Sequence, residues 1–329
     1  MRPSFSRGSD PVFDLLLGAA FAWVLIGSAG EVAQPPAVAD DVQAARSQQG
    51  PTLESAYEPM PPALEPARVE RPLDPATAEL QALVVRGRHW RVETPRGPVH
   101  VWAPEGYDPV TATTVVYVHG YHADADTVWR THRLPEQFAL SGVNALFVVP
   151  EAPTGKHDAI AWSSPAALLR TIKGELDVSL PAGRLAAIGH SGAYRTIIQW
   201  LGDARLDTVV LLDAAYVDVW PYRTWVVAAR KRRLINVSID TIRWSDRLHR
   251  TLPSTVTVDG FPREITDGLR AARILYIRSD IGHWPLVTEG VALPAMVRAL
   301  HATRVLDVEP PLGLPPGPER SALAERQAE

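Results

Sequence analysis

Short apolar runs rich in β-branched residues recur along the chain and alternate with longer segments of helical periodicity. The clearest run is Thr-Thr-Val-Val-Tyr-Val at 113–118, and similar runs occupy residues 144–149, 184–188, 208–212, 234–239 and 273–277. Runs that are apolar on both sides of the chain are typical of strands buried on both faces, as in parallel sheets. The pattern therefore predicts an α/β domain, with a mostly parallel twisted sheet and helices on both faces.

The segments around these runs complete the expected domain. Residues 89–93 and 99–102 are short alternating runs joined by Thr-Pro-Arg-Gly-Pro, which predicts a hairpin. Helical spacing predicts helices over 76–84, 164–176, 193–201, 220–230, 243–252 and 291–301, and a helix or loop over 129–140.

The first 30 residues have the composition of an export signal. Arg2 and Arg7 precede an uncharged apolar stretch at 15–26, and small residues follow at 27–30. This order resembles a secretory signal peptide. The stretch is shorter than the roughly 20 residues that span a bilayer, so an uncleaved membrane anchor is the alternative. Both interpretations predict an exported protein, periplasmic or extracellular, and the second adds N-terminal membrane association.

Composition separates the remaining segments. Residues 31–78 are rich in Pro and Ala without sustained periodicity, which predicts a disordered linker, and 306–329 are expected to form a similar Pro-rich tail. Residues 79–305 are expected to form the folded domain.

A formal net charge of -4 argues against nucleic acid as a partner, and the absence of Cys excludes disulfides and Cys nucleophiles.

A strand, a sharp turn and a helix are expected around Gly189-His190-Ser191-Gly192-Ala193, directly after the apolar residues 185–188. Small residues on both sides of Ser191 allow a tight, strained turn. Such a turn lifts the Ser hydroxyl above the sheet at a helix N-terminus, where developing negative charge is favoured. The pattern is that of a nucleophile elbow.

Further candidate catalytic residues come directly after other expected strands. They are Gly120 in His119-Gly120-Tyr121, Asp213, Asp240 and His283. The carboxyl ends of parallel strands meet at one edge of a sheet, so these residues should lie together with Ser191.

With Ser, acid and His in this order, residues 82–303 resemble the α/β-hydrolase superfamily. The resemblance implies that Ser191 is the nucleophile and that His283 is the general base and acid. It also implies an oxyanion hole made by the backbone N–H groups of Tyr121 and Gly192, with Gly120 and Gly189 as turn glycines. No cofactor and no metal are expected.

The acid that orients His283 stays open between two residues. Asp213 is favoured, because Leu-Leu-Asp-Ala-Ala resembles the acid turn of hydrolases that use the earlier strand. Asp240 follows the next strand, the more frequent acid position, and an N-cap of the helix at 243–252 is its competing role. His190 is expected to pack, and His249 to lie in a surface helix.

These expectations together predict an exported serine hydrolase that cleaves carboxylic esters through an acyl-enzyme, with a small ester or acyl compound as its substrate. Two alternatives remain: a peptidase or amidase with the same triad, and a catalytically silent binding protein on the same fold. The sequence does not predict an oligomeric state.

Overall fold

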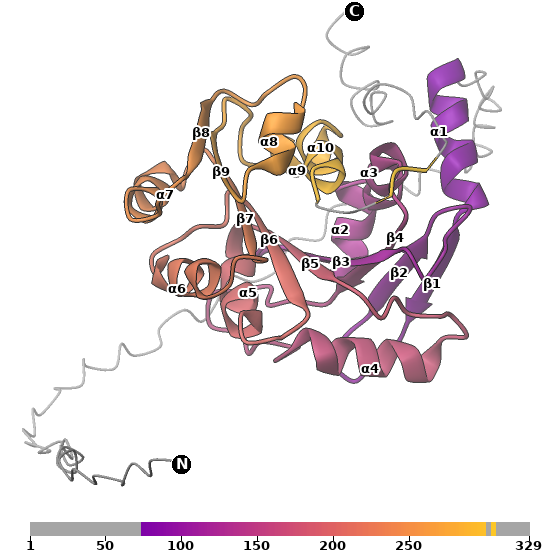
Figure 1. Cartoon of the computed structure of the whole chain (residues 1–329). Helices are drawn as coiled ribbons and strands as arrows, with labels where there is room; N and C mark the ends of the chain where they lie inside the picture. The colour runs from indigo at the N-terminus through magenta and orange to yellow at the C-terminus, as the bar shows by residue number, and fades with distance from the viewer. Residues whose placement is uncertain (1–73, 301–303, 307–329) are drawn as a thin grey trace, which may run out of the picture. The chain divides into compact units, whose positions relative to one another are not determined.

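The computed structural model describes residues 74–300 and 304–306 (Figure 1). The expected signal or anchor segment, and nearly all of the expected linker and tail, lie outside the described residues. Helix α1 (Pro75–Arg86) starts four residues before the expected domain boundary at 79. It buries Leu80 and Leu83, so these residues belong to the folded unit.

A nine-stranded sheet forms the centre of the described part of the chain, in the order β1-β2-β4-β3-β5-β6-β7-β9-β8. The strands are β1 (Arg88–Val92), β2 (Val99–Ala103), β3 (Thr113–Val118), β4 (Ala145–Pro150), β5 (Leu185–His190), β6 (Leu206–Leu212), β7 (Arg233–Ser238), β8 (Val256–Asp259) and β9 (Ile274–Arg278). Only β1–β2 and β2–β4 pair antiparallel, and the other pairings are parallel. The mostly parallel sheet and the hairpin are confirmed.

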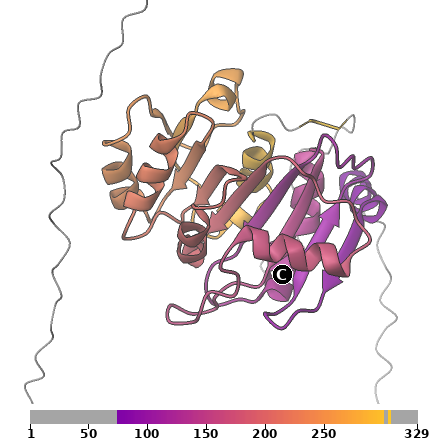
Figure 2. The ribbon, with the colours of Figure 1, turned by 60° about the horizontal axis from the view of Figure 1, so that its bottom comes forward.

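Helices cover both faces of the sheet (Figure 1). Helices α4 (Pro165–Glu175), α5 (Tyr194–Trp200), α6 (Trp220–Ala228) and α7 (Ile242–His249) lie on one face. Figure 2 shows α4 crossing in front of the strands. The opposite face carries α1, α2 (Ala125–Thr131), α3 (Leu134–Ser141), α8 (Asp267–Ala271), α9 (Pro285–Thr288) and α10 (Ala292–Arg298). This is the architecture that the resemblance to the α/β-hydrolase superfamily implies.

None of the helices within the described ranges has the length and apolarity needed to cross a membrane.

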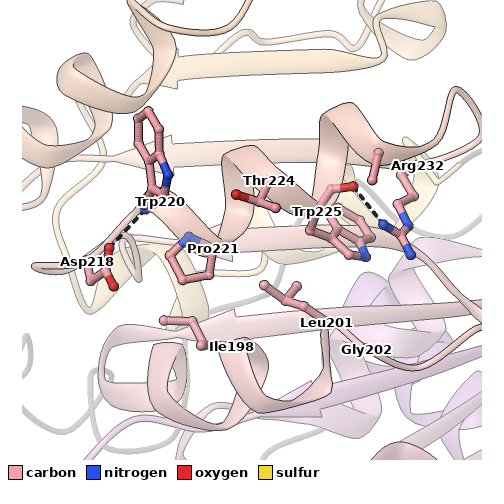
Figure 3. Close-up of a pocket in the computed structure, with 10 residues that line it drawn as sticks. Ile198, Leu201, Gly202, Asp218, Trp220, Pro221, Thr224, Trp225 and Arg232 are labelled. Atoms are coloured by element: carbon pink, nitrogen blue, oxygen red, sulfur yellow. Dashed lines mark hydrogen bonds between the residues drawn. The ribbon is translucent and has the colours of Figure 1, made fainter. Parts of the chain in front are cut away.

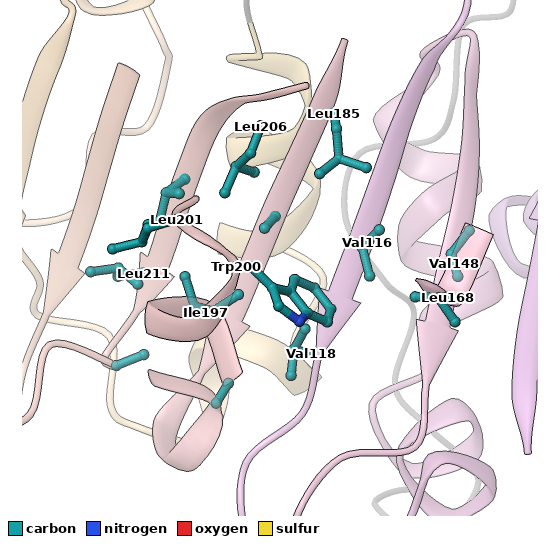
Figure 4. Close-up of a cluster of buried hydrophobic side chains, with 14 of the residues drawn as sticks. Val116, Val118, Val148, Leu168, Leu185, Ile197, Trp200, Leu201, Leu206 and Leu211 are labelled. Atoms are coloured by element: carbon teal, nitrogen blue, oxygen red, sulfur yellow. The ribbon is translucent and has the colours of Figure 1, made fainter. Parts of the chain in front are cut away.

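Two hydrophobic cores follow from the pleat of the strands. Along β3, Val116 and Val118 belong to the core under α4 and α5, whereas Val115 and Tyr117 belong to the core on the other face. Successive side chains of a strand point to opposite faces, so a strand apolar at every position fills both cores. Trp200 of α5 fills the first core, where it is 1% exposed and donates from Nε1 to the Trp162 carbonyl at 2.7 Å (Figure 4).

Candidate active site

Ser191 occupies a strained turn between β5 and α5. Its φ is 52°, in the left-handed region that side chains other than Gly rarely adopt. A 3-10 turn (Ser191–Ala193) then leads into α5, so the chain passes directly from strand to helix. The local geometry is the strained strand-to-helix turn expected at a nucleophile elbow, and it sits at the carboxyl edge of the sheet.

Two glycines permit close packing around this turn. A Cβ on Gly120 would lie 2.7 Å from the Ser191 Cβ and 3.3 Å from the Gly192 nitrogen. A Cβ on Gly192 would lie 2.6 Å from the ring of Tyr121. Neither position has room for a larger residue, because the turn after β3 presses against the turn after β5. Gly120 and the ring of Tyr121 therefore both pack against Gly192.

His119 fixes the turn after β3. Its Nδ1 donates to the Gly120 carbonyl at 2.8 Å, and its Nε2 accepts from the Ala152 N–H at 3.1 Å. The ring is buried and links the ends of β3 and β4. Sequence reasoning treated His119 only as part of a motif; its position directly after a buried strand was the available signal.

Asp213 is fully buried at the end of β6, and its carboxylate accepts a dense set of hydrogen bonds. Its Oδ1 accepts from the Ile239 N–H at 3.0 Å and from the N–H and hydroxyl of Thr241 at 2.9 and 2.7 Å. Its Oδ2 accepts from the Asp240 N–H at 3.3 Å. Successive N–H groups of this kind form a concave site for an anion.

His283 Nδ1 lies 2.6 Å from Asp213 Oδ2 and donates to it. Burial by itself raises the pKa of Asp213, but the hydrogen bonds from His283, Thr241 and the Ile239 N–H outweigh that effect and lower the pKa to about 2. Asp213 is therefore ionised at neutral pH. The imidazole must carry its proton on Nδ1, which leaves Nε2 as the acceptor.

Asp240 stands beside this pair with different surroundings. Its carboxylate lies 3.9 Å from His283 Nδ1, and its side chain is 66% exposed. Asp240 does not have the competing role of a helix cap: Thr241 holds the N-cap position of α7, without a side-chain cap. The Thr241 hydroxyl is turned instead to Asp213, a role that the sequence analysis missed.

The Ser191 hydroxyl interacts with the hydroxyl of Tyr216, in the loop that follows Asp213. Burial, followed by the charges of Asp213 and Asp240, raises the pKa of Tyr216 to about 12, so the phenol stays protonated. Within the described residues, Ser191 has no hydrogen bond with His283. Such bonds are often long in enzymes without substrate and shorten when substrate binds.

Two other histidines, His190 and His249, are buried and pack against aromatic rings. His190 is fully buried, its ring lies 4.6 Å from that of His283, and its Nε2 donates to the His283 carbonyl at 3.1 Å. Burial lowers its pKa well below the usual value, so it is neutral. The prediction that His190 packs is confirmed. The prediction of a surface position for His249 is wrong, because this ring is buried and stacks on Tyr276 at 4.3 Å.

Metal-ligating atoms come close together at one place among the described residues, where atoms of Asp213, Asp240 and His283 lie within 4.8 Å of one another. Both oxygens of Asp213 accept from N–H or O–H groups, and His283 Nδ1 carries a proton toward one of them. A metal ion needs unprotonated ligand atoms. These donors fit a hydrogen-bonded acid–imidazole pair better than a cation.

An apolar pocket of about 460 Å³ lies between α5 and α6 (Figure 3). Ile198 of α5 and Leu201, which follows the last residue of α5, form one wall, and Pro221 and Trp225 of α6 lie opposite them. None of Ser191, Asp213 and His283 lines this pocket, so it is separate from the candidate active site.

No protein-family model and no curated protein matches the chain. Its fold is similar to that of the feruloyl esterase module from Clostridium thermocellum, at 10% identity and a TM-score of 0.44 over 66% of this chain and 87% of that chain. S-formylglutathione hydrolase from Staphylococcus aureus is 15% identical, with a TM-score of 0.41 over 64% and 96% of the two chains. An esterase from Pyrococcus furiosus is 13% identical, with a TM-score of 0.36 over 68% and 93%.

Proposed function

We propose that the chain is a serine hydrolase that cleaves carboxylic esters through an acyl-enzyme, with Ser191 as nucleophile, His283 as base and Asp213 as orienting acid. The observation that carries the proposal is the 2.6 Å hydrogen bond between His283 and the buried Asp213. It lies at the same sheet edge as Ser191, whose φ of 52° is typical of a strained catalytic turn.

The proposed reaction follows from the direction of this hydrogen bond. With its proton on Nδ1, His283 accepts the Ser191 hydroxyl proton at Nε2 while Oγ bonds to the carbonyl carbon of the ester. The imidazolium then gives that proton to the departing alkoxide, and the C–O bond of the ester breaks. Water repeats the sequence on the acyl-enzyme and releases the acid. Asp213, ionised, stabilises the imidazolium in both halves.

The negative oxygen of each tetrahedral intermediate needs donors that are already in place. We assign this role to the backbone N–H groups of Tyr121 and Gly192. The glycine contacts described above support the assignment, since Gly120, the residue before Tyr121, packs against Ser191 and the Gly192 nitrogen. Gly192 also lies in the first turn of the helical segment after Ser191, where N–H groups have no intrahelical partner.

The test is Ser191→Ala with p-nitrophenyl esters and a fluorophosphonate probe. The variant should fold, lose ester turnover by at least about 10³-fold and take up no probe. Ser179→Ala is a matched control, because Ser179 is exposed in the connection that enters the amino end of β5; it should behave as wild type. Unchanged turnover in Ser191→Ala would refute the proposal.

The same assay separates the alternatives. Probe uptake at Ser191 with cleavage of amides instead of esters would indicate a peptidase or amidase, and an unreactive Ser191 would indicate a binding protein. An ester is the simpler substrate for such a site, because an alkoxide leaves more readily than an amine and needs less help from a general acid.

We also propose that the chain is exported. The basic residues Arg2 and Arg7 followed by the apolar stretch at 15–26 support this, and they allow either cleavage or membrane anchoring. Fractionation of cells that express the full chain, compared with a chain lacking residues 1–30, tests it. Equal retention of both forms in the cytoplasm would refute export.

A further inference from the structure

We infer that Asp240 is a second, positioning carboxylate for His283, which adds negative charge beside the imidazolium and can accept the Nδ1–H hydrogen bond when Asp213 is lost. The inference rests on the proposed function, since it concerns the base of that reaction. The two acids differ in burial: Asp213 is inaccessible, whereas Asp240 is 66% exposed.

Neighbouring strands bring the two carboxylates together. Strands β6 and β7 pair in parallel, and Asp213 and Asp240 each follow one of them. The backbone N–H of Asp240 donates to Asp213 Oδ2, while its side chain turns toward His283. One peptide thus supports the first acid and presents the second to the same imidazole nitrogen.

The contact of the Asp240 carboxylate with His283 Nδ1, at 3.9 Å, is its one ion pair among the described residues. Its charge also acts on Tyr216, in the loop after β6, and raises the pKa of that phenol. A capping role is excluded, because α7 begins without a side-chain cap. A carboxylate that serves only as a cap or turn residue would be expected to accept from neighbouring N–H groups.

The charges around His283 make the effect measurable. The groups that face it are Asp213 from β6, Asp240 from β7 and His190 from β5, and His190 is neutral. The imidazolium formed in each proton transfer therefore meets one buried and one exposed negative charge. The exposed charge is partly screened by water, so its contribution should be modest and should decrease with added salt.

Asp240→Asn tests the charge. For an exposed charge about 4 Å away, we expect about a fivefold loss of kcat/KM at low salt. The ratio of wild type to variant should approach one at 1 M salt. The acid limb of kcat/KM against pH should move to lower pH by about half a unit, because the imidazolium is less stabilised. Asp177→Asn removes an exposed carboxylate in the connection between α4 and β5 and should change none of these quantities.

Asp213→Ala, alone and combined with Asp240→Asn, tests the replacement role. A side-chain rotation that moves the Asp240 carboxylate by about 1 Å would bring it into hydrogen-bond distance of His283 Nδ1. Asp240→Asn should therefore lower kcat/KM about fiftyfold in the Asp213→Ala background, compared with about fivefold in the wild type. Should Asp213→Ala fail to fold, Asp213→Asn takes its place in the double variant. The pH profile of Asp240→Asn alone still tests the role of Asp240.

The outcomes separate this inference from the proposed function. A reactive Ser191 with an unmoved acid limb, an unchanged salt dependence and no extra loss in the double variant would overturn the role of Asp240 alone. A wild-type protein whose Ser191 takes up no fluorophosphonate would overturn both.

Discussion

Replacing Thr241 by Val removes one hydrogen bond from Asp213 and leaves the main chain in place. The Thr241 hydroxyl donates to Asp213 Oδ1 at 2.7 Å, while the N–H groups of Ile239 and Thr241 donate to the same oxygen. Val keeps the branched shape, so no cavity forms. A hydrogen bond to a charged group contributes about 1.5–3 kcal/mol, and we expect the free energy of unfolding at pH 7 to fall by about 2 kcal/mol.

The loss should depend on pH in a defined direction. Asp213 has a pKa of about 2 in the folded protein against 3.8 in the unfolded chain, so it contributes stability above pH 3.8 that disappears as the pH falls toward 2. Without the hydroxyl the folded pKa should rise. The difference between Thr241→Val and wild type should then shrink between about pH 4 and 2, by about 1.4 kcal/mol for each unit of the rise.

Urea unfolding at pH 7, 5 and 3, with kcat/KM on a p-nitrophenyl ester, measures both effects. We expect kcat/KM to fall about tenfold, which corresponds to 1.4 kcal/mol of transition-state stabilisation. Thr208→Val is the matched control, because the buried Thr208 hydroxyl donates to Asp207 at 3.0 Å elsewhere on β6. The control should lose stability but keep its activity. A Thr241→Val variant equally destabilised at pH 7 and pH 3 would refute the reasoning.

Two further substitutions test the oxyanion turn and the core. Gly192→Ala places a Cβ 2.6 Å from the Tyr121 ring and should lower kcat about 10²–10³-fold, whereas Gly202→Ala, with open space around it, should not; retained activity would remove the two amides from the mechanism. Trp200→Ala empties a site that is 1% exposed and should lower the free energy of unfolding by about 3–5 kcal/mol in urea; a loss below about 1 kcal/mol would contradict its place in the core.

The strands that the sequence predicts best are those with the strongest pattern. Residues 113–118 are apolar on both sides, and β3 covers the same range because both faces are buried. Strand β8 (Val256–Asp259) was missed: it is a four-residue edge strand with mostly exposed side chains, so no apolar run marks it. Edge strands are commonly short and polar, which hides them from periodicity.

The candidate site shows a similar division. Residue type and order were enough to nominate Ser191 and His283, since each follows a strand whose end faces the same edge. The choice between Asp213 and Asp240 could not be made in this way, because β6 and β7 are neighbours and both acids reach that edge. Their distances from His283 depend on the path of the loop that carries His283. His190, 93 residues away in sequence, holds this loop by donating to the His283 carbonyl.

The environment of Asp213 explains why a sequence motif could favour this acid without excluding Asp240. Three of its donors are backbone N–H groups at residues 239–241, which any residue other than Pro supplies. The side chains of His283 and Thr241 lower the pKa of Asp213 most, and the backbone N–H groups of Ile239 and Thr241 lower it further. The same backbone turns the Asp240 carboxylate outward, toward His283 and solvent. The geometry of one turn thus gives two similar acids different exposures and different distances from the same imidazole.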